Sequence, residues 1–459
     1  MNEKTRIPWG MLPVILSLAW PTMLEQLLQT AVQYIDTAMV GSLGTEATAA
    51  VGSTTTVNWL IGSTISALGV GFLAFISKAH GAKEFEKAKR ASAQAVLVVL
   101  IVGIFFTALT LLFSGFVPAW MQVDEDIRSL SSQYFFILYT PMLARTATII
   151  FGTILRASGD TKTPMLAGIW VNLTNVVLNF FLIYPTRSVM LFSWEIVIPG
   201  AGWGVIGAAI ASAIAFFVGG VCITVALLRH PHVSPRGYSL CPDWQILKPC
   251  FKVAIPNAMQ RFGTSLGYVV FAAMVNSIGD VATAAHTIAN TVESAFYIPG
   301  YGMQTAAATL AGNAYGAKDR DQLRALSRMI LVIEVAMMTV SGGLLFLLAP
   351  SVMSLFSTDA QVVLLGMTVL RMVAVSEPFY GVSIVVEGMM QGMGRTVMPL
   401  IGNVTGMWLI RIVGTFVCTQ IFSFGLVGAW ACMIAHNLVM FCMFAFYYVS
   451  GRWNPLQRE

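Results

Sequence analysis

Twelve long apolar segments limit what this chain can fold into more than any other feature of its sequence. A helix needs about 20 mostly apolar residues to span a bilayer. Each of the twelve reaches that length, and they cover residues 12–40, 47–77, 91–118, 129–155, 163–184, 203–228, 247–276, 282–313, 325–352, 360–390, 397–422 and 425–449. The segments between them are short, so the sequence predicts an all-α polytopic membrane protein of twelve transmembrane helices.

The composition agrees with this class and argues against several others. The chain is 57% hydrophobic and 10% charged, whereas soluble domains are about 45–50% apolar and about 25% charged. Its six cysteines show no CxxC spacing, so neither a disulfide framework nor a metal site is predicted. The sequence also lacks a Walker A motif and an HExxH motif. We therefore expect no cofactor, no ATP-driven transport within this chain and no zinc proteolysis.

The distribution of Lys and Arg predicts how the helices are oriented. With both termini inside, twenty of the 26 Lys and Arg residues fall in cytoplasmic segments. Only Arg128 and Arg187 fall on the opposite side, and the remaining four lie within helices. Such a bias is typical of cytoplasmic loops. We expect a multi-pass protein of the cell (inner) membrane with cytoplasmic termini, whose net charge of +5 reflects orientation and gives no indication of nucleic-acid binding.

The sequence repeats itself at a constant offset of 235 residues. Matching pairs include Pro21 with Pro256, residues 47–50 with 282–285, 81–83 with 316–318, and Gly159 with Gly394. Each half holds six helices, so both halves enter the membrane with the same orientation. Parallel repeats of this kind give alternating access by rocking. We predict an N-terminal lobe at 1–228, a cytoplasmic linker at 229–246 and a C-terminal lobe at 247–459.

Several loops resemble signatures of the multidrug and toxic compound extrusion (MATE) family. These are RASGDTKTP at 156–164, its degenerate copy QGMGRTVMP at 391–399, GNAYGAK at 312–318 and DTAMVG at 36–41. The resemblance implies a V-shaped transporter of two six-helix lobes that works as a monomer. It also implies export of small cationic amphipathic drugs or metabolites in exchange for H⁺ or Na⁺.

The first apolar segment contains a carboxylate, Asp36. A charged side chain at the centre of a bilayer costs about 2.5–3.5 kcal/mol on insertion scales, and such residues face a cavity or a partner. The resemblance implies that Gln29 and Asp36, seven residues apart, are the helix-1 Gln and Asp of the bacterial first-lobe site. On helix 5 it implies an Asn and an Asp four residues apart. Asn175 matches the Asn, and Asn179 stands where the Asp is expected.

The spacing of the polar residues on helix 1 supports a site in the first half. Glu25, Gln29 and Asp36 are 4 and 7 residues apart, so they share one helix face. The nearby Tyr34 is a further candidate for binding. Their repeat counterparts, Gln260, Thr264 and Phe271, include no acid. We favour ion or substrate binding at Asp36 over a structural ion pair. For Glu25 both binding and a position at the membrane interface remain open.

The second half has its own charged residues within predicted helices, namely Arg261, Glu293, Glu334, Arg371, Glu377, Glu387 and Arg411. The mixture of signs predicts buried ion pairs. His286, Asn290 and Glu293 are expected to form one polar face of helix 8. Glu377 precedes Pro378, whose missing N–H frees a carbonyl, so this pair is the main functional candidate in the second half. Glu334 is expected to be an isolated packing residue.

These features support a cation-coupled exporter and leave one alternative, a flippase for lipid-linked saccharides of the same wider fold. A flippase would favour a cationic cavity, but the predicted helices hold six acids and four arginines. No nucleophile and base can be assembled into an enzyme site, and a two-repeat chain supplies no ring of filter residues for a channel. We favour H⁺ over Na⁺, because the first-lobe cluster has one carboxylate and Na⁺ prefers several oxygen ligands. A sodium site at Asp36 remains open.

Overall fold

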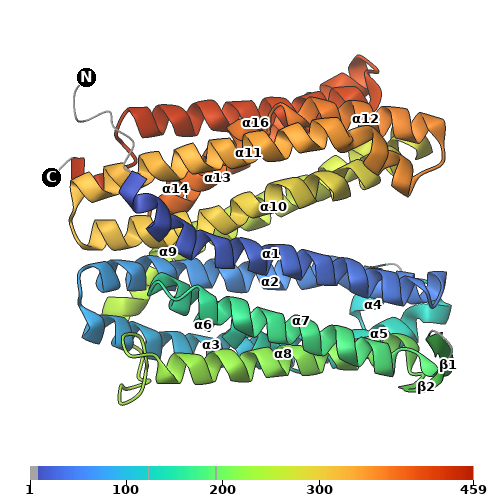
Figure 1. Cartoon of the computed structure of the whole chain (residues 1–459), viewed down its shortest axis with the longest axis horizontal. Helices are drawn as coiled ribbons and strands as arrows, with labels where there is room; N and C mark the ends of the chain where they lie inside the picture. Colours follow the sequence, from blue (N-terminus) through green and yellow to red (C-terminus); the bar gives the residue numbers. More distant parts are fainter. Residues whose placement is uncertain (1–8, 122, 192–193, 458–459) are drawn as a thin grey trace.

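The computed structural model describes residues 9–121, 123–191 and 194–457. Lys4, Arg6 and Arg458, which contributed to the predicted charge bias, lie outside these residues. Figure 1 shows long helices that run side by side, with the first half of the chain forming the lower bundle and the second half the upper one. Helix α1 begins and α16 ends at the same end of the molecule.

The first half contains eight helices and one hairpin. The helices are α1 (Leu12–Gly41), α2 (Thr45–Gly81), α3 (Phe85–Phe113), α4 (Val117–Trp120), α5 (Glu125–Tyr139), α6 (Met142–Ala157), α7 (Lys162–Leu182) and α8 (Gly204–Arg229). The sequence predicted only a longer loop after α7. The structure instead has an antiparallel hairpin there, formed by β1 (Pro185–Leu191) and β2 (Trp194–Ala201).

The second half repeats the helical order without the hairpin. Its helices are α9 (Trp244–Asn276), α10 (Asp280–Gly316), α11 (Arg320–Phe356), α12 (Ala360–Ala374), α13 (Glu377–Gly392), α14 (Val397–Thr405), α15 (Val413–Phe416) and α16 (Gly425–Val449). Two π-helical segments, Gly406–Ile412 and Val417–Ile421, flank α15 and continue α14 as one span. Short 3₁₀ turns cover Trp9–Met11 and Pro455–Gln457.

Two spans that the sequence predicted as single helices, 129–155 and 360–390, are broken in the structure. Helices α5 and α6 meet at an angle of 49°, and α12 and α13 at 54°. The breaks fall at residues 140–141 and 375–376, which are 235 residues apart. Proline lacks the N–H that would continue the helix, and Pro141 and Pro378 lie at the start of α6 and α13. The prediction of continuous helices was therefore wrong, while the matched breaks confirm the repeat.

The described residues confirm the predicted fold class. Eight helices are long and apolar enough to cross a membrane, and each bent pair adds one more span. Helices α9 and α10, with 33 and 37 residues, complete the twelve. The chain is an all-α polytopic membrane protein of two parallel six-helix repeats in a V shape.

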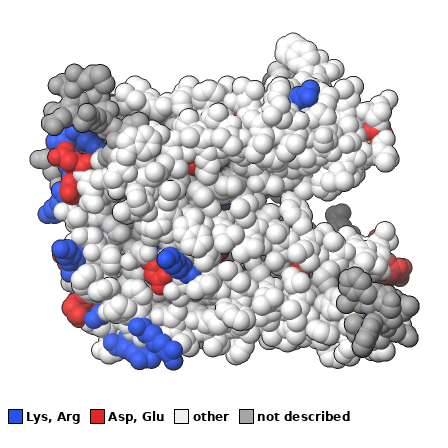
Figure 2. Space-filling view, viewed as in Figure 1, with Lys and Arg blue, Asp and Glu red and all other residues white. Residues whose placement is uncertain are grey.

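The two halves meet at one end of the molecule and separate at the other. Figure 2 shows a notch between them at the end that carries the hairpin, while Lys and Arg gather at the opposite end of the face shown. At that basic end α2 and α10 pack closely. A Cβ added to Gly81 would lie 2.7 Å from the Cα of Asn313, and a Cβ added to Gly316 would lie 2.7 Å from the Cα of Lys78. Gly81 and Gly316 are repeat counterparts, so the two halves close on each other through equivalent glycines.

Candidate functional site

Asp36 is the first member of a polar chain that links three helices of the first half. The Nδ2 of Asn179 on α7 donates to the Oδ1 of Asp36 at 2.6 Å, and it also lies 3.1 Å from the Oδ1 of Asn175. The Nδ2 of Asn175 lies 3.0 Å from the Oγ of Ser212 on α8. The family resemblance pointed to Asp36, Asn175 and Asn179, but not to Ser212.

The cluster lies toward the end of the molecule where the halves separate. Asp36 is five residues before the end of α1 and is half-buried. Asn175 and Asn179 are 5% and 1% exposed. The side chain of Asp36 is therefore partly accessible, and the amide of Asn179 holds its carboxylate. Such a group can bind a cation or a proton and is fixed in orientation by a neutral partner.

The other predicted residues of helix 1 lie in different surroundings. Gln29 is exposed. The hydroxyl of Tyr34 reaches the second half, where it donates to the carbonyl of Thr291 at 3.3 Å and lies 3.4 Å from the Oγ of Ser294. The structure thus brings Asn175 and Asn179 to Asp36 but places Tyr34 at the junction with α10.

Glu25 is not part of the Asp36 cluster. Its two carboxylate oxygens lie 3.1 and 3.0 Å from the Nη1 of Arg156 on α6. It is eleven residues before Asp36, which is about 16 Å along a helix. Because Arg156 already holds this carboxylate, the geometry favours a structural role over the predicted binding role.

In the second half, the place that corresponds to the pair of Glu25 and Arg156 contains an acid, Glu387, that was not predicted as a site residue. Gln260 and Gln391, the repeat counterparts of Glu25 and Arg156, donate to the Oε1 of Glu387 at 2.7 and 2.8 Å. Asn403 donates to its Oε2 at 3.0 Å. The acid of this network therefore lies on α13, whereas α9, the seventh span, contains no acidic residue. The repeat offset itself was the signal that could have found this network.

The predicted ion pairs of the second half are not formed. All ion pairs among the described residues lie elsewhere in the chain. The guanidinium of Arg411 lies 4.2 Å from the ring centroid of Phe271 and 4.9 Å from that of Tyr268. Arg371 lies over Phe346 at 5.2 Å, and Arg261 donates to Asn257 at 3.0 Å. Aromatic faces and amides contact these arginines directly, so the prediction of direct ion pairs was wrong. At longer range Arg411 acts on Glu293 and Arg261 acts on Glu387.

The predicted polar face of helix 8 also divides into separate environments. His286 accepts a hydrogen bond from Trp430 at 3.2 Å, Asn290 is exposed and Glu293 is buried. The carboxyl of Glu293 lies within electrostatic range of Glu377 at the start of α13. An acid that acts on Glu293 is thus Glu377 on α13, and His286 and Asn290 lie in other surroundings.

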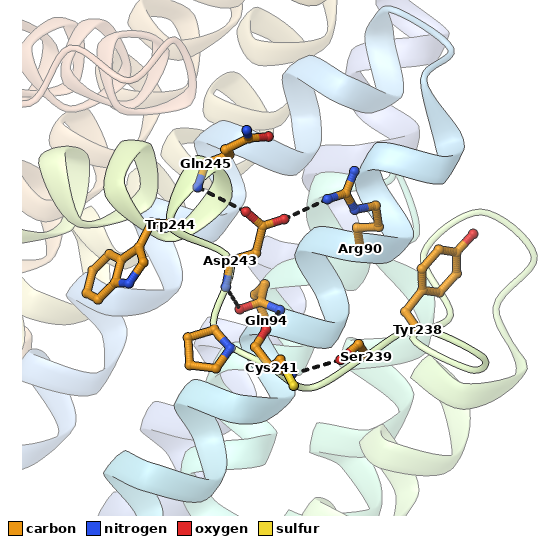
Figure 3. A pocket seen from close by; sticks show the side chains of 9 residues that line it. Arg90, Gln94, Tyr238, Ser239, Cys241, Asp243, Trp244 and Gln245 are labelled. Carbon is orange, nitrogen blue, oxygen red and sulfur yellow. Dashed lines mark hydrogen bonds and ion pairs between the residues drawn. The ribbon is translucent and has the colours of Figure 1, made fainter.

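A pocket of about 440 Å³ lies apart from both polar clusters, where the 229–246 segment meets α3. Asp243 is central to it, as Figure 3 shows. Its carboxylate pairs with Arg90 at 2.7 Å and accepts from the N–H of Gln245 at 3.0 Å. Its own N–H donates to Gln94 at 2.9 Å. These contacts start α9 and fasten the linker to α3, so we interpret the pocket as an anchor and not as a transport site.

Comparisons with known proteins agree with the repeat. The family described as MatE matches residues 21–181 and 256–417, which together exceed half of the chain. The two matched segments begin at Pro21 and Pro256, at the repeat offset of 235. The match therefore covers both halves in the same register.

Individual relatives align over nearly the whole chain. A probable multidrug resistance protein NorM of Thermotoga maritima is 26% identical over 440 residues, which are 96% of this chain and 92% of the relative. A probable multidrug resistance protein YoeA of Bacillus subtilis is 24% identical over 89% of this chain and 87% of its own length. The structure is similar to an outward-facing conformation of a multidrug resistance MATE family transporter, with a TM-score of 0.88, 24% identity and coverage of 97% and 96%.

Proposed function

The chain belongs to the MatE family of transporters, and on that premise we propose that it is a secondary active antiporter that exports organic cations. The chain is a transporter and not an enzyme. The names of its relatives support multidrug efflux as the transport class. The observation that carries the proposal is the half-buried Asp36, which Asn179 fixes in the half of α1 that lies toward the open end of the molecule.

One carboxylate can exchange a drug for a proton if both bind to it. A cationic drug is attracted by ionised Asp36, and protonation of the same group removes the charge that holds the drug. Drug and proton then compete, which supplies the differential affinity that exchange requires. Gln29, Tyr34 and Asn290 are proposed as polar contacts of the drug, since all three side chains are exposed on α1 and α10.

The donor set around Asp36 favours H⁺ over Na⁺. Sodium prefers several hard oxygen ligands, and a second carboxylate would help to offset its dehydration. Among the described contacts of Asp36, Asn179 presents an N–H donor to the carboxylate. An N–H group binds an acceptor and cannot serve as a cation ligand. A proton needs only one carboxylate whose charged form is disfavoured by desolvation.

The protein is proposed to work as a monomer. Its two lobes, 1–228 and 247–459, are proposed to rock against each other so that the contact between α2 and α10 at the basic end closes and opens. In the second lobe, Glu293 and Glu377 are proposed as a further site of negative charge, because both are buried and within electrostatic range of each other. A flippase for lipid-linked saccharides remains the alternative. The acidic residues of both lobes favour cationic cargo over it.

Gradient-driven transport in proteoliposomes tests the coupling ion. At fixed sodium, an imposed pH gradient is expected to drive uptake of a fluorescent organic cation into inside-out vesicles. A sodium gradient at equal pH on both sides is expected to drive none. If the sodium gradient alone drives transport, and Asn179→Asp leaves its sodium dependence unchanged, proton coupling is excluded.

The orientation of the chain gives a second prediction. Arg236 lies in the linker at the basic end, so a membrane-impermeant thiol reagent is expected to label Arg236→Cys in inside-out vesicles and not from outside intact cells. The background would lack native cysteines, because Cys241 in the same linker is exposed. Ser188→Cys in the hairpin is the matched control and should show the reverse pattern. Labelling of position 236 from outside would contradict a cytoplasmic linker.

A further inference from the structure

Glu334 lies near the middle of α11 and is entirely buried, at 0% exposure. Among the residues that the structure describes, neither of its carboxylate oxygens has a hydrogen-bond partner. An ionised carboxylate without a partner in an apolar interior is strongly disfavoured, and such a group takes up a proton instead. The packing therefore holds Glu334 in its neutral form.

The space around this carboxyl group is made by two glycines from neighbouring helices. A Cβ added to Gly300 on α10 would lie 2.8 Å from the Oε1 of Glu334, and a Cβ added to Gly381 on α13 would lie 3.0 Å from the same atom. Any larger residue at either position would require the carboxyl group to move. The slot is thus fitted to a carboxyl group between three helices.

The first half shows that the scaffold does not need this arrangement. At the repeat offset of 235, Glu334, Gly300 and Gly381 correspond to Val99, Ile65 and Thr146. Val99 and Ile65 are buried core residues. In the first half the same three-helix junction is filled by Val in place of the acid and by Ile and Thr in place of the two glycines. The repeat therefore shows that apolar packing can fill this junction without a carboxyl group.

The neighbours of Glu334 suit a proton better than a metal ion. Glu377 on α13 lies within electrostatic range of both Glu334 and Glu293 on α10. In the described part of the chain, no three His, Cys, Asp or Glu side chains converge on a point where a metal ion could bind.

We propose that Glu334 is a proton-carrying group of the second lobe that couples its protonation to the packing of α10 and α13 against α11. The proposal rests on the proton-coupled export proposed above. With the helices packed as seen here, one carboxylate oxygen carries the proton. When the protein opens at the basic end and α10 and α13 move away from α11, water from that end reaches the group, the O–H bond breaks and the proton leaves to that water. When the protein returns to the conformation seen here, a proton binds again from the opposite side, so each cycle moves one proton through Glu334 in addition to that exchanged at Asp36.

The ratio of protons to drug molecules tests this proposal. In proteoliposomes, an opposing drug gradient is varied until net flux under a fixed pH gradient is zero, which gives the ratio. Glu334→Gln keeps the shape of the neutral acid but binds no proton, so the ratio is expected to fall by about one, because a carboxyl group binds one proton. Glu334→Asp is expected to keep the wild-type ratio. Val335→Leu, at the exposed neighbouring position on α11, is the control and should change nothing.

Two outcomes would overturn the proposal: an unchanged ratio in Glu334→Gln, or equal ratios in the Gln and Asp variants. If the Gln variant folds but does not transport, infrared difference spectroscopy on drug addition replaces the flux measurement. The wild type is then expected to show a protonated-carboxyl band that the Gln variant lacks, and identical bands would contradict the proposal. Absence of proton-driven export in the wild type would instead contradict the proposed function itself.

Discussion

Replacing Asp36 by Asn is expected to reduce proton-driven drug export to the level of empty vesicles. The substitution keeps the size of the side chain and its contact with Asn179, but it removes the negative charge and the proton-binding site together. Folding is expected to be nearly unaffected, since the group is half-buried and its partner is a neutral amide. The measurement is the initial rate of dye export under a fixed pH gradient, normalised to the amount of protein in the membrane.

The control for this variant must lose one charge at the same end of the molecule without touching the cluster. Glu46, which is exposed in the first turn of α2, meets this need. Glu46→Gln is expected to export at the wild-type rate. Wild-type export by Asp36→Asn at equal membrane abundance would refute a role for the carboxylate in coupling.

Alanine at Gly81 and Gly316 is expected to open the basic end of the transporter. Each added methyl group would meet the backbone of the partner helix, at Asn313 and Lys78 respectively. Overpacking of this kind costs about 1–3 kcal/mol, and every 1.4 kcal/mol changes an equilibrium tenfold. The contact between α2 and α10 forms only when the two halves are closed at the basic end. The double variant should therefore shift the population toward the conformation that is open at the basic end.

Distances between spin labels at the basic end measure this shift. Ala82→Cys and Ala317→Cys are repeat counterparts, and both positions are exposed in the turns that follow α2 and α10. In a background without native cysteines, the double glycine variant is expected to show a larger share of long distances. The matched control is Gly52→Ala on α2, where an added Cβ has no atom within 4 Å. A distance distribution that matches this control would contradict the closure role of the two glycines.

The sequence predicted the number of spans, the repeat and the fold class because long apolar segments and registered Gly and Pro positions determine them. It missed the breaks near Pro141 and Pro378, since hydropathy does not distinguish a straight span from a bent one. The break in the second half nevertheless places Glu377 at the start of α13. The hairpin after α7 was also missed, because its alternating residues lie outside the apolar segments.

Site residues were predicted where the pattern lay within a single helix. The polar face of helix 1 pointed to Asp36, and the family resemblance pointed to Asn175 and Asn179. Contacts between helices were predicted poorly. Arg371 and Arg411 pack on aromatic rings and form no direct ion pair with the acids. Glu334 lies in a slot whose space depends on the distant Gly300 and Gly381. Sequence spacing cannot show which faces of distant helices meet.

Proton release on drug binding tests the central claim most directly, because it measures the competition at Asp36 without requiring transport. Purified protein in weakly buffered solution is mixed with an organic cation while the pH is recorded, at a starting pH where the wild-type group is partly protonated. The wild type is expected to release protons as the drug binds, and its drug affinity should fall as the pH is lowered. Asp36→Asn should release fewer protons and bind the drug weakly at every pH. Equal release by both proteins, or drug affinity of the wild type that does not change with pH, would contradict the exchange of proton and drug at this carboxylate.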